Sequence, residues 1–190
     1  MRRSKSNSTY FGTEQRLLHA AAKVLKEKHA LGVKTREISR EAGLANSSFY
    51  IHYKSLSDLI DKNEAKILDA IDHVIDREQK VGSSTETILR NILFVLRKHQ
   101  DVLDIVIGSE NLSLPLKAMA KLRPLITRSW NSYGEKADDA IYRLVEFQFM
   151  AEVSIWKSED FSIDTLSKHA SHLAFFSANA PRLFIQIYYK

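Results

Sequence analysis

The chain of 190 residues carries a formal net charge of +5, is 44% hydrophobic, and contains 6 glycines, 3 prolines and no cysteine. The lack of cysteine excludes disulfides and thiolate metal sites, and no uninterrupted apolar run approaches the roughly 18 residues that a membrane span requires. Few glycines and prolines, and almost no alternating β-branched runs, predict an all-helical protein of one or two domains. The basic start has no apolar core like that of a signal peptide, so a cytoplasmic protein without a membrane partner is expected.

The basic charge is concentrated in the first third of the chain. Residues 1–62 hold 12 Lys and Arg against 6 Asp and Glu, a net charge of +6, whereas residues 63–190 hold 16 against 17, a net charge of −1. This distribution is expected if the first third meets a polyanion such as DNA. A chance asymmetry of the surface charge is the alternative.

The chain is predicted to begin with a basic arm and an amphipathic helix. Residues 1–12 show no hydrophobic periodicity and predict a flexible arm, whose three basic residues either reach DNA or only keep the tail solvated. Residues 13–28 carry a one-sided helical stripe, formed by Leu17, Leu18, Ala21 and Leu25. This helix is predicted to pack across two short helices and to complete a three-helix domain over residues 13–55.

Two short helices around a tight turn are predicted within residues 34–54. Thr35 can N-cap the first helix, and Gly43 suits the left-handed backbone that ends it. In the second helix Phe49 and Tyr53 lie one turn apart and face inward. The other side chains face outward, namely Asn46, Ser47, Tyr50, Ile51, His52 and Lys54. This is the layout of a helix-turn-helix whose second helix enters the DNA major groove.

Residues 56–190 are predicted to form a second helical domain. Ser55 and Asp58 make a start like a capping box for a connecting helix over residues 56–79, which links the two domains. Further helices are predicted at about 85–99, 101–107, 114–132, 136–157 and 162–178. The chain then has about nine helices, with a bundle in the second domain on which the apolar tail 182–190 docks.

The predicted helix at 136–157 has two apolar stripes, roughly 130° apart at 100° per residue. One stripe consists of Ala140, Leu144, Phe147, Ala151 and Ile155, and the other of Ile141, Val145, Phe149, Val153 and Trp156. A surface helix needs one stripe, so two predict either a two-fold dimer interface or the centre of a monomeric bundle. The candidate dimer residues are Ile141, Val145, Phe149 and Val153, with Leu166, Ala170 and Leu173 from the small-residue face of the next helix.

Large apolar side chains of the second domain are candidates to line a pocket for a small apolar or aromatic ligand, with ordinary core as the alternative. They are Phe94, Trp130, Tyr133, Phe147, Met150 and Trp156. His169 and His172 have the i,i+3 spacing of two metal ligands, but no third ligand accompanies them, so no metal site is expected.

Residues 13–62 follow a specific succession, in which the amphipathic helix is followed by TREISREAGL and then by SFYIHYKSLSDLI. This succession resembles the TetR family of bacterial transcriptional regulators. The resemblance implies an Ω-shaped homodimer with an N-terminal DNA-binding domain and a C-terminal domain for ligand binding and dimerisation. It also implies, as a rule, a repressor of a palindromic operator that an unidentified small molecule releases, and no cofactor.

The resemblance also assigns roles within the helix-turn-helix. The residues implied to hold backbone phosphates are Thr35, Ser48, Tyr50, His52 and Lys54. The residues implied to contact base edges are Arg36, Asn46, Ser47 and Ile51. Two positions depart from the family pattern, because Ala45 stands where the recognition helix commonly has a capping Ser and Leu56 stands where a Lys commonly contacts a phosphate. The cap therefore either moves to Asn46 or is absent.

Two other functions remain open from the sequence. A protein with this fold can act as a co-activator through another protein instead of binding DNA itself. An enzyme is the third reading, but the sequence has no glycine-rich phosphate loop, nucleophile elbow or HExxH motif to support one.

Overall fold

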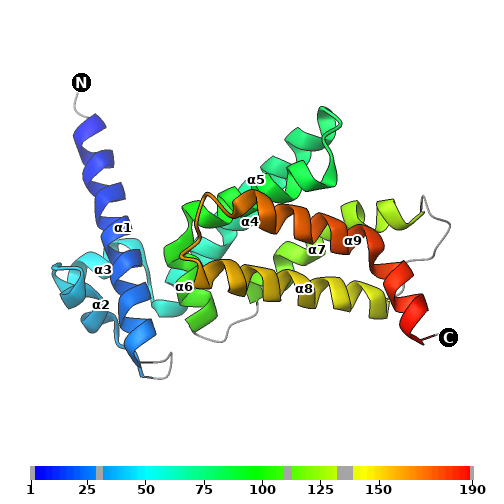
Figure 1. Cartoon of the computed structure of the whole chain (residues 1–190). Coiled ribbons are helices and arrows are strands. Elements are labelled where there is room, and N and C mark those ends of the chain that lie inside the picture. Colours follow the sequence, from blue (N-terminus) through cyan, green and yellow to red (C-terminus); the bar gives the residue numbers. More distant parts are fainter. Residues whose placement is uncertain (1–2, 29–31, 109–112, 132–138, 189–190) are drawn as a thin grey trace. The chain divides into compact units, whose positions relative to one another are not determined.

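The computed structural model describes residues 3–28, 32–108, 113–131 and 139–188, which form nine α-helices joined by turns (Figure 1). The helices are α1 (Arg3–Lys28), α2 (Thr35–Glu41), α3 (Asn46–His52), α4 (Leu56–Lys80), α5 (Thr85–Lys98), α6 (Gln100–Gly108), α7 (Ser113–Asn131), α8 (Asp139–Ser158) and α9 (Leu166–Tyr188). The predicted all-helical fold is thereby confirmed.

The first and last helices of the chain differ from their predicted bounds. Helix α1 begins at Arg3, so most of the segment 1–12, expected to be an arm without regular structure, belongs to a helix. Helix α9 begins at Leu166 instead of 162 and continues past Pro181 to Tyr188, so the expected separate tail is its last two turns. A proline fits within a helix when its fixed φ is already helical, although it removes one backbone hydrogen bond.

The first compact unit comprises residues 1–67 and 99–112. It contains α1, α2, α3, the first half of α4, and α6, which follows α5 in the sequence but packs against α1. Its core is formed by side chains that are fully buried, among them Leu17, Leu25, Ile38, Phe49 and Leu59. Helix α1 therefore meets α6 with one part of its surface and the helix-turn-helix with another.

The second compact unit comprises residues 68–98 and 113–190. Helices α5 and α8 both pack against α9, and Figure 1 shows α8 and α9 side by side. The turn between them is fixed by Phe161, which is buried edge-on against Trp156 with ring centroids 5.2 Å apart. Phe161 has a φ of 50°, a conformation rare outside glycine, and its carbonyl accepts a hydrogen bond from Arg97 of α5.

None of the described helices is both long and apolar enough to cross a lipid bilayer.

Candidate nucleic-acid interface

The turn between α2 and α3 is held by an arginine from α1. The guanidinium of Arg16 donates hydrogen bonds to the carbonyls of Ala42, at 2.6 Å, and Gly43, at 3.2 Å. These carbonyls lie at the C-terminal end of α2, where backbone acceptors lack helical partners. Gly43 has a φ of 62°, as predicted, and a Cβ there would lie 3.2 Å from the Arg16 guanidinium. The turn thus needs glycine for its backbone and for its fit against α1.

A buried polar network fixes the end of the recognition helix α3 to α1 and α4. Tyr53, the residue after α3, donates to Glu14 of α1 at 3.0 Å and accepts from the Asn63 amide of α4 at 3.1 Å. Lys66 of α4 pairs with the same Glu14 carboxylate. Burial alone would raise the pKa of Glu14, but the hydrogen bonds from Lys66 and Tyr53 hold it below its ordinary value. The carboxylate therefore stays ionised between its two donors.

Two of the predicted phosphate-binding residues lie next to each other on the surface. The hydroxyls of Thr35 and Tyr50 are 3.0 Å apart, although the residues belong to different helices. Thr35 was predicted as the N-cap of α2, which is wrong, because Thr35 is the first residue of the helix. Lys34 occupies the cap position, and its backbone N–H donates to Glu37. With no capping bond to make, the Thr35 hydroxyl is available to Tyr50.

The other predicted phosphate contacts differ in accessibility. Lys54 is exposed and Ser48 is half-buried. His52 was expected to face outward, which is wrong, because only 8% of it is exposed. Its ring stacks on Tyr10 of α1 with centroids 4.0 Å apart, and its Nδ1 is buried without a hydrogen-bond partner in the described structure. Burial lowers the pKa of His52, which disfavours a charged contact with phosphate.

The four predicted base contacts are all exposed, namely Arg36, Asn46, Ser47 and Ile51. The recognition helix has no side-chain cap, since its N-cap is Ala45 and its first turn is closed by backbone hydrogen bonds alone. Asn46 consequently keeps its amide free of a capping role. Asn and Arg both offer bidentate hydrogen bonding to base edges, and Ile51 offers a methyl contact.

The positive charge of this face is only partly neutralised within the protein. Lys23 pairs with Glu41 and Lys28 with Glu37, both between α1 and α2. Among the residues that the structure describes, no carboxylate pairs with Arg36 or Lys54. Arg36 lies on α2 and Lys54 lies two residues after the end of α3, so both unpaired cations lie on or beside the helices that carry the exposed base-contact candidates.

The predicted ligand-pocket residues that the structure describes lie in different surroundings. Trp130 and Trp156 are fully buried and donate their indole N–H groups to the carbonyls of Ser177 and Ser162, so they belong to the core. Phe147 is 77% exposed, and Phe94 lies at the surface beneath the Lys98 ammonium. Of the remaining two, Met150 is half-buried and Tyr133 lies outside the described residues.

The predicted dimer residues are buried within their own protomer, so that assignment is corrected. This holds for Ile141, Val145, Phe149, Val153, Leu166, Ala170 and Leu173. The opposite stripe of α8 carries the exposed apolar side chains, with Leu144, Phe147 and Ile155 at the surface. The two stripes have therefore exchanged roles, because α9 packs against the one that was assigned to the partner.

The two histidines of α9 are bound by carboxylates. His169 is buried, with Nδ1 2.7 Å from Glu152 and Nε2 2.9 Å from Glu159. His172 places its Nδ1 3.1 Å from the same Glu152 oxygen. Within the described residues, no group of three or more ligating side chains is arranged to hold a metal ion.

Comparisons with known proteins give one match to the sequence of the helix-turn-helix and one match to the fold. Residues 17–62 match the family model of bacterial regulatory proteins of the tetR family. The crystal structure of a transcriptional regulator (TerR/AcrR family) from Aquifex aeolicus VF5 is similar with a TM-score of 0.56 and 16% sequence identity, over 90% of this chain and 99% of that chain. No curated protein sequence matches the chain. The first finding covers the helix-turn-helix, and the second covers the fold.

Proposed function

We propose that the chain is a transcriptional regulator of the TetR family and that it binds DNA itself, as a homodimer on a palindromic operator. The observation that carries the proposal is the face formed by α2 and α3, where the exposed base-contact candidates flank the paired hydroxyls of Thr35 and Tyr50. The helices behind this face are fixed by Arg16 and Glu14 of α1. A rigid support of this kind reduces the entropy lost when the face docks on DNA.

The phosphate contacts are proposed for Thr35, Tyr50, Ser48 and Lys54. Two hydroxyls 3.0 Å apart can donate to one phosphate together, which fixes the register of α3 in the groove without reading sequence. His52 is left out of this set because its ring is covered by Tyr10. Its place at the end of α3 suits a packing role.

A dimer is proposed because a two-fold axis presents two recognition helices to two half-sites, about 34–36 Å apart along the DNA. The exposed stripe of α8 supports it, since Leu144, Phe147 and Ile155 form a row of large apolar side chains that the described residues leave exposed. Exposed apolar rows of this kind are typical of protein interfaces. Phe175 on the neighbouring helix α9 is also exposed and would extend the same interface.

Repression, and release of the repressor by a small molecule, are proposed on the family resemblance. A dimer that covers an operator blocks transcription sterically, and a ligand that binds better to a form unable to engage both half-sites releases it. No residue of the described structure is proposed to hold a cofactor.

The test is a selection of operator sequences by the purified full-length protein from a pool of random duplexes, followed by footprinting of the enriched sequence. We expect a palindrome whose half-sites lie one DNA turn apart, and a discrete footprint with no other protein present. If nothing is enriched and no footprint forms, while the protein is folded and dimeric, direct reading of DNA is wrong. Action through a partner protein then becomes the better explanation.

A further inference from the structure

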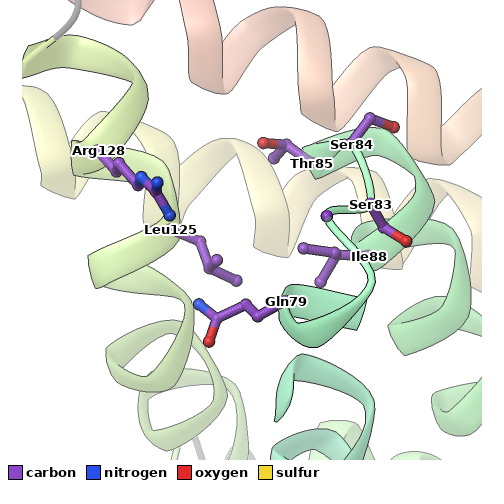
Figure 2. A pocket seen from close by; sticks show the side chains of 8 residues that line it. Gln79, Ser83, Ser84, Thr85, Ile88, Leu125 and Arg128 are labelled. Carbon is purple, nitrogen blue, oxygen red and sulfur yellow. The ribbon is translucent and has the colours of Figure 1, made fainter. Parts of the chain in front are cut away.

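A cleft of about 410 Å³ opens between the α4–α5 turn and α7, within the second unit (Figure 2). It is lined by Gln79, Gly82, Ser83, Ser84, Thr85, Ile88, Leu125 and Arg128. Figure 2 shows Thr85 and Ile88 pointing into it from the α5 side and Leu125 from the α7 side, with Arg128 at its edge. Its volume is in the lower part of the range of small-molecule sites.

The charged group of the cleft is Arg128, which is exposed. Among the described residues, no carboxylate pairs with its guanidinium. Two acidic residues adjoin the lining in sequence. Glu78, next to Gln79, has its carboxylate occupied, because Arg77, Ser83 and Asn91 all donate to it. These donors lower the pKa of Glu78, with the Ser83 hydroxyl contributing most. Glu86, next to Thr85, accepts a hydrogen bond from Ser171. Within the described part of the chain, Arg128 is thus without a carboxylate partner and can pair with a bound anion.

Two apolar side chains, Ile88 and Leu125, lie among the mostly polar residues that line the cleft. Ile88 is buried and Leu125 is half-buried, so an occupant that covers them removes apolar surface from water. The Thr85 hydroxyl and the Gln79 amide add uncharged hydrogen-bonding groups beside them. An apolar floor formed by Ile88 and Leu125, with one guanidinium at the edge and uncharged polar groups around it, fits a molecule that has a compact apolar body and one negative end.

We infer that this cleft binds a small organic carboxylate, with the carboxylate on Arg128 and the apolar body over Ile88 and Leu125. A guanidinium matches a carboxylate with two parallel N–H···O bonds, which a neutral amide or an alcohol cannot accept in the same way. An inorganic anion would satisfy the charge but would leave the apolar floor uncovered.

The cleft is also placed to serve regulation, and this part of the inference rests on the proposed function. Gln79 stands in the last turn of α4, a continuous helix whose first residues, 56–67, belong to the unit that carries α3. A ligand in this cleft therefore lies beside Gln79, in the last turn of the helix that begins just after the recognition helix. The bound carboxylate is the effector that weakens operator binding.

Binding is tested first without DNA, by ¹⁹F NMR titration of the full-length protein with 4-fluorobenzoate and with its neutral isostere 4-fluorobenzamide. We expect saturable binding of the benzoate and affinity for the benzamide lower by about tenfold, the loss of one charge-assisted pair. Arg128→Gln is expected to weaken benzoate binding by about tenfold as well. Arg90→Gln is the matched control, since Arg90 is an exposed arginine of α5 outside the cleft lining, and it should leave the affinity unchanged.

Equal affinities for benzoate and benzamide, equal affinities of the Arg128→Gln variant and the parent, or no saturation up to about 10 mM would overturn the site. Inorganic phosphate that competes as strongly as benzoate would overturn the organic class of the ligand. Because these titrations contain no DNA, their outcome does not depend on whether the protein binds an operator. The regulatory part is tested separately, by whether 4-fluorobenzoate lowers operator affinity in the parent protein but not in Arg128→Gln, and an equal effect on both proteins overturns it.

Discussion

The phenol of Tyr53 donates a hydrogen bond to Glu14 over 3.0 Å, which ties the residue after the recognition helix to the middle of α1. Burial raises the pKa of Tyr53, so the phenol keeps its proton across the physiological range. Tyr53→Phe removes this donor and the acceptor of the Asn63 amide while keeping the ring. We expect a free energy of unfolding lower by about 1–2 kcal/mol, from polar groups left buried without a partner, measured by urea denaturation.

Tyr50→Phe is the matched control for that measurement, because Tyr50 is an exposed tyrosine of the same helix region. Its loss of one hydroxyl is expected to leave stability unchanged within about 0.5 kcal/mol. Equal destabilisation by both changes would mean that the network around Glu14 does not stabilise the unit.

Phosphate contacts and base contacts are separated by a second pair of variants. Tyr50→Ala is expected to weaken binding to operator and to random duplex by the same factor, since phosphates are alike in both. Arg36→Ala is expected to lose about 1–3 kcal/mol of discrimination between the two duplexes, because a guanidinium fork reads a base edge. Titration of each variant against both duplexes measures the ratio, with Arg90→Ala as an exposed arginine control. Equal losses on both duplexes for Arg36→Ala would contradict its role in reading bases.

His52 makes stability depend on pH in a direction that its burial determines. Because burial lowers its pKa in the folded protein, the unfolded chain takes up a proton first as the pH falls below about 6.5. Stability is therefore lost between that value and the lower pKa of the folded state. Glu14, Lys62 and Lys66 also act on the His52 charge, and Glu14 opposes the shift. His52→Phe keeps the stack on Tyr10, and we expect a flatter profile of unfolding free energy below about pH 6.5.

The same variant tests the correction made to the interface. If the His52 ring packs on Tyr10 and does not hold phosphate, His52→Phe should keep the operator affinity within about twofold at neutral pH. A change of that size is typical of substitutions that remove no specific contact. A loss as large as that of Tyr50→Ala would restore His52 to the phosphate contacts.

Local sequence patterns predicted the helix-turn-helix well because its helices are set by near neighbours. Phe49 and Gly43 specify their own burial and turn within a few residues. His52 was misplaced because its cover, Tyr10, comes from a segment without hydrophobic periodicity that nevertheless lies in α1. A local sequence pattern cannot predict a contact between residues 42 positions apart.

The second unit shows the limit of periodicity more clearly. The two stripes of α8 are equally apolar, so their spacing predicts that both are covered but not which one faces the protomer. The choice is made by α9, which packs on the stripe containing Val145 and Phe149. Helix α6 likewise joins the first unit through its packing on α1, a long-range contact that the sequence order conceals.

The buried carboxylate of Glu152 is expected to stabilise the pairing of α8 and α9. Its carboxylate lies within hydrogen-bonding distance of both His169 and His172, and a buried polar group left without its partner costs about 1–3 kcal/mol. Glu152→Ala is therefore expected to lower the unfolding free energy by an amount in that range in urea denaturation. Asp76→Asn, an exposed carboxylate of α4, should change it by less than about 0.5 kcal/mol. Similar small effects of both would show that the cluster is not structurally required.

The exposed stripe of α8 predicts where a dimer forms. Phe147 is 77% exposed and lies one turn from Leu144, so Phe147→Asp leaves the protomer core intact but places a charge in the proposed interface. A buried, unpaired charge costs several kcal/mol, enough to dissociate a dimer at micromolar concentration. Light scattering during size-exclusion chromatography should show a dimer for the parent and for Ile163→Asp, an exposed apolar residue outside the stripe, and a monomer for Phe147→Asp. A Phe147→Asp protein that remains dimeric would place the two-fold interface elsewhere. Because palindrome reading needs both recognition helices, a monomeric Phe147→Asp protein should also lose its preference for the full operator over a single half-site.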